Sequence, residues 1–259
     1  MKFGVQTFTI RRAQKKSITD AYLPLINMGV RSFEVARIDF NEKNAQELCS
    51  LVSDHGIEIS SIQVKPKYIF NTPRRIIEFC KLTGCKNAVI SMLPFECILG
   101  SDEKFYSFVS SLDAQFDLYA ENGITLAYHH HNWEYVRLAN GKTRMQELLA
   151  RTERIKFVHD TYWTARCGID PVLQIKGFGE RLIGIHLRDL THGKRGLNVI
   201  PRDAAIGEGV LDFERIIRAA EGVGCSYYAI EQKTDDPYRN IEKSFGSLEQ
   251  IKARILEKE

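Results

Sequence analysis

The chain has 259 residues, of which 44% are hydrophobic and 27% charged, with 36 Lys and Arg against 33 Asp and Glu. This length is sufficient to bury one large core and is typical of an α/β barrel, which needs about 250 residues. The near-balance of charge argues against a nucleic-acid-binding protein, which is usually much more basic.

The N-terminus and the cysteines indicate where the protein works. The first residues, MKFGVQTF, contain no apolar stretch followed by a small-residue cleavage site, so no secretory signal is predicted. No run of about 18 apolar residues predicts a membrane span. The six cysteines form no CxxC motif, which favours buried free thiols over a disulfide framework. We therefore expect a cytoplasmic protein without a membrane partner.

Short apolar segments alternate with amphipathic segments along the chain. The predicted strands cover 2–8, 32–35, 58–64, 87–91, 125–128, 155–160, 182–186 and 227–230. The predicted helices cover 18–28, 45–55, 72–82, 103–122, 143–150, 171–178, 213–222 and 241–256. Five of these helices lead into a glycine, the residue that most readily closes a helix in the left-handed conformation: Gly29, Gly56, Gly84, Gly123 and Gly224.

Eight strands alternating with eight helices predict a parallel sheet. We interpret the chain as one α/β domain over residues 1–259, a (β/α)8 TIM barrel. A doubly wound open sheet is the alternative, and it usually has a glycine-rich phosphate loop after its first strand. The residues after Phe8, TIRRAQKKS, contain no glycine, which favours the barrel.

Polar and ionisable residues end nearly every predicted strand. In a barrel the C-terminal strand ends form the active site. The residues at these ends are Gln6, Glu34, Gln63, Lys65, Ser91, His129, His131, Asp160, His186, Arg188 and Glu231. Buried groups of this kind need partners, and one divalent cation held by two carboxylates and one or two imidazoles would satisfy them together. This mixed oxygen and nitrogen set suits Mn²⁺, Zn²⁺, Co²⁺ or Fe²⁺ better than Ca²⁺.

Seven short motifs lie along the chain in order. They are FGVQ at 3–6, GVRSFE at 29–34, YHHHNWEY at 128–135, HDTYW at 159–163, IHLRD at 185–189, GEGVLDF at 207–213 and AIEQ at 229–232. Each is a weak signal alone, but together they make the chain resemble the sugar phosphate isomerase/epimerase family of the xylose-isomerase-like TIM barrel superfamily. The resemblance covers nearly the whole chain and implies the fold of that superfamily.

The resemblance implies one bound divalent metal ion, with Mn²⁺ expected first and Zn²⁺, Co²⁺, Mg²⁺ or Fe²⁺ as alternatives. The family binds its metal through Glu, Asp, His and Glu from its last four strands. Three of these positions match here as Asp160, His186 and Glu231, whereas His129 stands where the family often has the first Glu. The fourth ligand is then His129 itself, Glu134 reaching back from a few residues on, or water.

The resemblance also implies an enzyme, namely an isomerase or epimerase that acts on a small sugar or keto-sugar, with or without a phosphate, through a metal-stabilised enediolate. Glu231 is expected to move the proton on one face of the substrate, and His129, His131 or Glu134 on the other. A dehydratase or lyase that acts on a keto-sugar, keto-inositol or keto-glycoside is the close alternative.

Two further functions are weighed against this one. A non-catalytic barrel subunit is a lesser alternative, which the missing Glu after 125–128 favours. Endonuclease IV, a DNA-repair barrel of the same superfamily, is disfavoured because Trp163 stands where that family has a metal-binding His. No nucleic-acid partner is therefore expected. The oligomeric state cannot be predicted from the sequence, and base rates alone leave a homodimer or another homo-oligomer open.

The expected substrate-binding residues are Glu34, Lys65, Trp163, Arg188 and Glu208. Each has a structural alternative. Glu34 could instead pair with Arg37, and Lys65 and Arg188 could form plain salt bridges. Trp163 could fill the interface between helices and barrel, and Glu208 could serve only to hold its glycine-flanked turn.

The remaining candidates lie around the expected ligands. Asp160 taken alone would indicate a helix N-cap. His131 faces the same way as His129 and is either an acid/base group or a structural one, whereas His130 faces the helices. The segment 191–202 is predicted to be a long loop whose basic residues either cover a phosphorylated substrate or are solvated.

Overall fold

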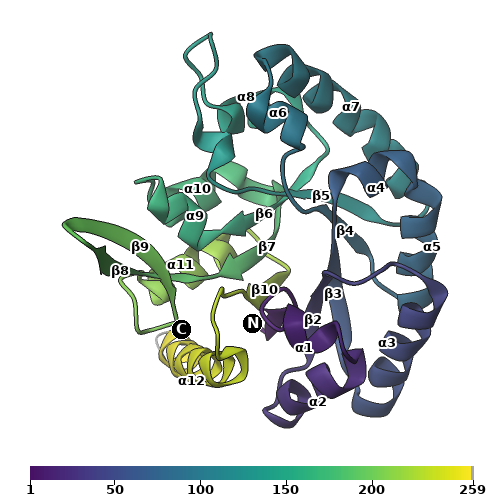
Figure 1. The fold of residues 1–259 in the computed structure, drawn as a ribbon, viewed down its shortest axis with the longest axis vertical. Coiled ribbons are helices and arrows are strands. Elements are labelled where there is room, and N and C mark those ends of the chain that lie inside the picture. The colour runs from purple at the N-terminus through teal and green to yellow at the C-terminus, as the bar shows by residue number, and fades with distance from the viewer. Residues whose placement is uncertain (258–259) are drawn as a thin grey trace.

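The computed structural model describes residues 1–257, in which eight parallel strands close into a barrel with helices around it (Figure 1). The strands are hydrogen-bonded in the order β1-β10-β7-β6-β5-β4-β3-β2. Their bounds are Phe3–Gln6 (β1), Ser32–Ala36 (β2), Glu58–Val64 (β3), Asn87–Ile90 (β4), Thr125–His129 (β5), Lys156–Asp160 (β6), Leu182–Leu187 (β7) and Tyr227–Ile230 (β10). The predicted fold class is confirmed, and all eight predicted strands are present.

The helices surround the barrel and connect successive strands (Figure 1). Eight of them overlap the predicted ones: Ile18–Asn27 (α2), Glu42–His55 (α3), Pro73–Thr83 (α5), Asp102–Ala120 (α7), Arg144–Arg151 (α8), Pro171–Phe178 (α10), Phe213–Gly222 (α11) and Pro237–Leu256 (α12). Gly56 and Gly84 close α3 and α5 in the left-handed conformation, as predicted. No helix within residues 1–257 has the length and apolar character that a membrane crossing requires.

The sequence analysis missed the 3₁₀ turn Gly179–Arg181 (η2) before β7 and several short elements after strand ends. The latter are the helices Arg11–Gln14 (α1), Pro66–Asn71 (α4), Phe95–Leu99 (α6) and Thr161–Arg166 (α9) and the 3₁₀ turn Trp133–Tyr135 (η1). A helix of four to six residues is too short to show the 3.6-residue periodicity on which the predictions rested. The elements that follow strand ends shape the C-terminal side of the barrel, where the predicted site residues lie.

The prediction of a loop over 191–202 is wrong. Strands Asp189–Arg195 (β8) and Asn198–Ala204 (β9) pair antiparallel along their whole length and project from the barrel as a hairpin (Figure 1). Its two-residue turn places Gly196 at φ 60°, which matches a type II′ turn with glycine at the first central position. That turn makes the segment extended and paired, and it brings Asp203 back to the end of the barrel.

The inside of the barrel is filled by a small apolar layer below the strand ends. Its members are Val89, Ala127, Val158, Tyr227 and Ala229, with Ile183 packed against them. Tyr227 reaches across the barrel because Gly184 has no side chain: a Cβ there would lie 2.2 Å from the Tyr227 ring. The phenol hydroxyl of Tyr227 then donates to Glu34 on β2, so the apolar layer supports the polar groups above it.

Candidate metal centre

Four buried side chains converge at the C-terminal ends of the strands. His129 ends β5, Asp160 ends β6, His186 lies on β7, and Glu231 directly follows β10. Each offers one ligand atom, and these atoms all lie within 4.8 Å of one another. The geometry thus brings together Asp160, His186 and Glu231 with His129 rather than with Glu134.

The spacing and orientation of these atoms fit a shared metal ion. Asp160 Oδ2 lies 3.7 Å from His129 Nε2 and 3.8 Å from His186 Nδ1, and Glu231 Oε2 lies 2.8 Å from His186 Nδ1. Tetrahedral coordination with bonds of about 2.1 Å places ligand atoms about 3.4 Å apart. Yet His129 Nε2 and His186 Nδ1 form no hydrogen bond with residues 1–257. Buried ring nitrogens that approach carboxylates without hydrogen-bond geometry are what a metal ion between them would require.

The opposite nitrogen of each ring is held by a neighbour. His129 Nδ1 lies 3.2 Å from the carbonyl oxygen of Ser91, and His186 Nε2 lies 2.5 Å from Glu34 Oε1. Both acceptors carry no proton, so each ring donates there, and once the ring is neutral its inward nitrogen has a lone pair for a metal ion. Metal-binding histidines are oriented in this way by a carbonyl or carboxylate behind them.

Glu34 lies behind His186 rather than in the cavity. Its side chain is fully buried, and it accepts hydrogen bonds from Gln63 Nε2 at 2.9 Å, from Tyr227 OH at 2.7 Å and from Ser61. Burial alone would raise the pKa of Glu34, but His186 and these donors lower it to about 2. The carboxylate is therefore ionised and holds the His186 ring, a role that the sequence analysis did not assign.

Asp160 is positioned for both roles that the sequence left open, helix cap and metal ligand. Its Oδ1 accepts from the backbone N–H of Trp163 at 2.9 Å and caps α9. Its Oδ2 faces the cluster and lies 3.1 Å from Arg188 Nη1. The helix cap thus fixes the carboxylate in the orientation that presents its second oxygen to the ligand cluster.

Arg188 connects the cluster to the hairpin. Its Nη1 lies 3.3 Å from Glu231 Oε1, and its Nη2 lies 2.8 Å from Asp203 Oδ1 on β9. Burial alone would raise the pKa of Glu231, but Arg188 and His186 lower it, so Glu231 is a carboxylate near neutral pH. Asp203 was missed because the segment directly before it, 191–202, was predicted to be a loop, although Gly196 in a two-residue turn was a usable signal for a hairpin.

The two other predicted active-site residues near β5, His131 and Glu134, lie in different surroundings in the structure. His131 lines the cavity between two indoles, with ring centroids 5.1 Å from Trp133 and 5.4 Å from Trp163. Glu134 is fully buried on the helix side, where it accepts from the His131 backbone N–H at 2.8 Å and from the hydroxyl of Tyr128. Both carboxylate oxygens of Glu134 are thus engaged outside the cluster, and Glu134 holds the loop that carries His131.

Only some of the expected substrate-binding residues line the cavity. Lys65, Trp163 and Arg188 line the cavity. Glu208 does not: it is exposed and pairs with Lys243 at 2.6 Å. Its turn is held instead by buried Asp189, which accepts from the backbone N–H groups of residues 190, 207, 209 and 211.

The cavity above the cluster has a volume of about 1120 Å³. Its lining includes Gln6, Gln63, His129 and Glu231 at the floor. Basic side chains from the first half of the chain are Arg11, Arg12, Lys15, Arg37 and Lys65, and those from the second half are Arg166, Arg188, Arg202 and Lys233. Against these nine stand four acidic residues, namely Asp39, Asp203, Glu231 and Asp235.

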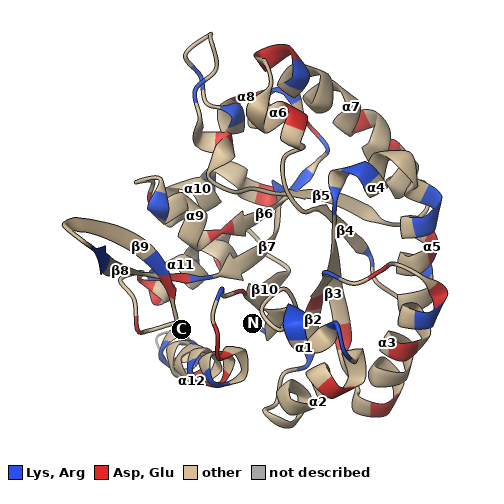
Figure 2. Ribbon diagram, viewed as in Figure 1, with Lys and Arg blue, Asp and Glu red and all other residues tan. Residues whose placement is uncertain are grey.

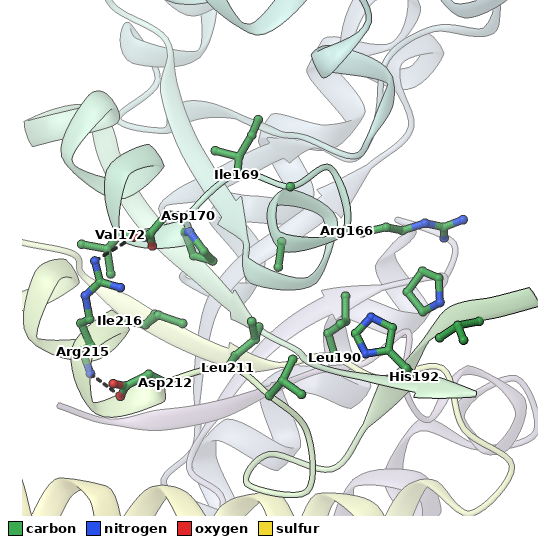
Figure 3. A pocket seen from close by; sticks show the side chains of 16 residues that line it. Arg166, Ile169, Asp170, Val172, Leu190, His192, Leu211, Asp212, Arg215 and Ile216 are labelled. Carbon is green, nitrogen blue, oxygen red and sulfur yellow. Dashed lines mark hydrogen bonds and ion pairs between the residues drawn. The ribbon is translucent and has the colours of Figure 1, made fainter. Parts of the chain in front are cut away.

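A second hollow of about 590 Å³ lies on the outer side of the hairpin, against α9, α10 and α11 (Figure 3). Its charged groups already have partners. Arg215 Nη2 lies 2.7 Å from Asp170 Oδ2, and Asp212 accepts from the Arg215 backbone to cap α11 (Figure 3). It contains no convergent set of free polar groups like that at the barrel end, so the barrel cavity is the candidate site.

Comparisons with known proteins agree with this architecture. A family model for the xylose isomerase-like TIM barrel matches residues 25–251. An inosose dehydratase from Geobacillus thermodenitrificans is 22% identical over 153 residues, which are 53% of this chain and 49% of that protein, so the match spans about half of the relative's length.

Two solved structures share the fold across almost the whole chain. A sugar phosphate isomerase/epimerase from Parabacteroides distasonis has a TM-score of 0.77 at 18% identity, with 95% of each chain covered. The IOLI protein, which has a zinc atom bound, has a TM-score of 0.67 at 14% identity, with 97% of this chain and 98% of that one covered. At these identities the likeness shows the fold alone.

Proposed function

Since this chain belongs to the xylose isomerase-like TIM barrel family and gathers four potential metal ligands beneath a cavity, we propose that it is a divalent-metal-dependent isomerase or epimerase of a small keto-sugar. The observation that carries the proposal is the convergence of His129, Asp160, His186 and Glu231 within 4.8 Å. The set of two carboxylates and two imidazoles accepts Mn²⁺, Zn²⁺, Co²⁺ and Fe²⁺, and Mn²⁺ is our first choice.

When bound, the metal acts as a Lewis acid that polarises a carbonyl and hydroxyl pair and so acidifies the adjacent C–H. The protein residues then bind the substrate and move its proton. Glu231 is the acceptor because it lines the cavity and Arg188 keeps it ionised. Gln6 donates toward Glu231 Oε2 at 3.4 Å and limits how that carboxylate can rotate.

His131 is the second proton-transfer group. Its ring lies between Trp133 and Trp163 on another wall of the cavity from Glu231. Return of the proton to the opposite face of the same carbon gives an epimer, and return to the neighbouring carbon gives an isomer. Trp163 also presents an apolar ring face to the C–H groups of a sugar.

One observation favours elimination as the second candidate. Glu231 is the single carboxylate of the cavity floor, and imidazoles stand where a second carboxylate base would act in an epimerase. Elimination needs one base and one acid. Glu231 would serve as both: it would take the proton, the C–O bond at the β-carbon would break, and the protonated Glu231 would return the proton to the departing hydroxide, which leaves as water. The match to an inosose dehydratase supports this alternative.

The test is exchange of substrate hydrogen with D₂O, because every one of these reactions begins with removal of a carbon-bound proton. Mn²⁺-loaded protein is incubated with a panel of keto-sugars and keto-inositols, and deuterium uptake is followed by NMR. We expect uptake with at least one compound, lost in Glu231→Gln and kept in Glu242→Gln, an exposed charge-matched change on α12. A metal-loaded wild type that exchanges no hydrogen across the panel would instead favour a non-catalytic barrel subunit.

A further inference from the structure

Positive charge is concentrated in the barrel cavity. Its lining has nine Lys and Arg against four Asp and Glu, an excess of five, whereas the entire chain has 36 against 33, an excess of three. The two carboxylates below the floor, Glu34 and Asp160, offset part of this excess and are themselves offset when a divalent cation is bound. Figure 2 shows basic residues on α1, beside the barrel end, and on the hairpin.

Two of these cations share one aromatic ring. The guanidinium carbon of Arg11 lies 4.1 Å from the centroid of the Phe8 ring, and that of Arg37 lies 5.3 Å from it. Arg11 also donates to the Phe8 carbonyl at 2.9 Å. Neither arginine forms an ion pair with any of residues 1–257, whereas neighbouring Arg12 reaches Asp235 at 3.5 Å. Two like charges are therefore held together without a carboxylate between them.

The backbone at Arg37 is unusual in the same place. Arg37 has φ 62°, and it is the one non-glycine residue in the described part of the chain with a positive φ. A long side chain is disfavoured in this conformation, and backbone strain of this kind concentrates at ligand sites. The turn that directly follows β2 thus brings Arg37 to Phe8 in a conformation that an asparagine or glycine would adopt more easily.

The arginine pair is connected to the ligand cluster by one short stretch of chain. Gln6 donates toward Glu231 and accepts from the Phe8 backbone N–H at 2.5 Å. Gln6 and Phe8 are separated by at most about 7 Å along the chain. A small substrate with one end at the cluster would therefore extend past Gln6 toward the two guanidinium groups.

We propose that Arg11 and Arg37 bind an anionic oxygen group, a phosphate ester or a carboxylate, at the end of the substrate remote from the metal. The substrate is then an anionic polyhydroxylated ketone, which narrows the proposed function and rests on it. Guanidinium groups suit this role because their parallel N–H donors match the oxygens of both anions. The confinement of the excess charge to one cavity fits a small anion rather than a polymer.

The first experiment does not depend on the metal or on turnover. Inorganic phosphate is titrated calorimetrically into chelator-treated wild type, the Arg11→Gln/Arg37→Gln double variant, and Arg74→Gln/Arg239→Gln, a control that loses the same charge at two exposed residues outside the cavity lining. We expect saturable binding that weakens at least about tenfold in the double variant, as loss of charge-assisted hydrogen bonds implies, and stays unchanged in the control. No saturable binding, or equal affinity in wild type and double variant, would overturn the proposal.

The second experiment identifies the anion. Mn²⁺-loaded protein is titrated with a ketohexose, its 6-phosphate and the hexulosonate that has a carboxylate at the same end. Tighter binding of the 6-phosphate assigns a phosphate ester, tighter binding of the hexulosonate assigns a carboxylate, and the double variant should lose either preference. Equal affinity for all three compounds in wild type contradicts the proposal. Phosphate binding at the arginines without hydrogen exchange on any substrate would instead refute the proposed function alone.

Discussion

Replacement of Glu34 by Gln tests whether the residue behind His186 controls metal binding. An amide cannot accept on both sides as the carboxylate does. Ser61 and Tyr227 bear hydroxyls that can rotate to accept from the new NH₂ group, whereas the N–H groups of His186 and Gln63 can only donate. The amide oxygen should therefore stay toward His186, and the variant loses the negative charge while it keeps the hydrogen bond.

The size of the effect follows from that geometry. Loss of an outer partner of a metal-binding histidine typically weakens metal binding about 10- to 100-fold, or roughly 1.4 to 2.7 kcal/mol. Glu34→Ala should in addition lower the free energy of unfolding by about 3–5 kcal/mol, because it leaves a buried cluster of donors without its acceptor. The isosteric Gln variant separates the effect on the metal from the effect on folding.

Metal affinity is measured by competition with a chromophoric chelator on purified wild type and variants. Glu147→Gln is the matched control, since Glu147 is also a buried glutamate in an ion pair but lies on α8 in the helix layer. We expect the control to bind metal like wild type. If Glu34→Gln also bound metal with wild-type affinity, His186 would not depend on Glu34 and the assignment of His186 as an oriented ligand would be wrong.

Three further outcomes are expected from the same structure. Asp160→Ala and His186→Ala should each lose the metal in elemental analysis of protein purified without chelator, and a full equivalent in either variant would contradict the ligand set. Burial alone would lower the pKa of His186, but Glu34 and Glu231 raise it well above 6.5 in the metal-free protein. Because ligation displaces that proton, metal affinity should rise with pH through the region of 6.5, by up to about tenfold per pH unit, and a flat affinity there would exclude protonation of His186. Asp189→Ala should lower the free energy of unfolding in urea by about 3 kcal/mol, since it leaves the buried backbone N–H of Leu190 and three part-buried N–H groups of the turn without their acceptor. Glu208→Ala in the same turn should change it by about 0.5 kcal/mol or less, and equal losses would show that Asp189 does not hold the turn.

The barrel was predictable because its strands are short apolar runs that end in polar residues. The strands Glu58–Val64 and Tyr227–Ile230 coincide with their predicted ranges, since both are followed at once by a turn or a charged residue. All four clustered side chains were identified in the same way, as ionisable groups at the ends of buried strands, with His129 and Glu134 left as alternatives for the fourth position. Periodicity alone identifies such positions, because burial forces the rest of the strand to be apolar.

Two kinds of feature could not be predicted from the sequence: the face of the sheet on which a side chain near a strand end lies, and contacts between residues far apart in the chain. Glu134 is near His129 in sequence, but it follows Tyr128 to the helix side of the sheet. Asp203 meets Arg188 only because a two-residue turn folds the hairpin back. For Asp160, a helix cap and a metal ligand were treated as competing functions, although a carboxylate has two oxygens: here one caps α9 and the other faces the ligand cluster.

The last prediction concerns His129→Glu, which restores the residue that the sugar phosphate isomerase/epimerase family often has at this position. Two carboxylates and two neutral imidazoles around a divalent ion carry no net charge, whereas a third carboxylate would leave one negative charge. His129→Glu should therefore bind a divalent metal more tightly and an anionic substrate more weakly. For unit charges about 8 Å apart at an effective dielectric constant of about 20, the added repulsion is about 2 kcal/mol. Affinities of the Mn²⁺-loaded variant for the ketohexose and its 6-phosphate measure this difference: the neutral sugar should bind as in wild type, and only the phosphate should bind more weakly. An equal loss for both compounds would point to damage of the centre itself, since Glu cannot donate to the Ser91 carbonyl as the His129 ring does.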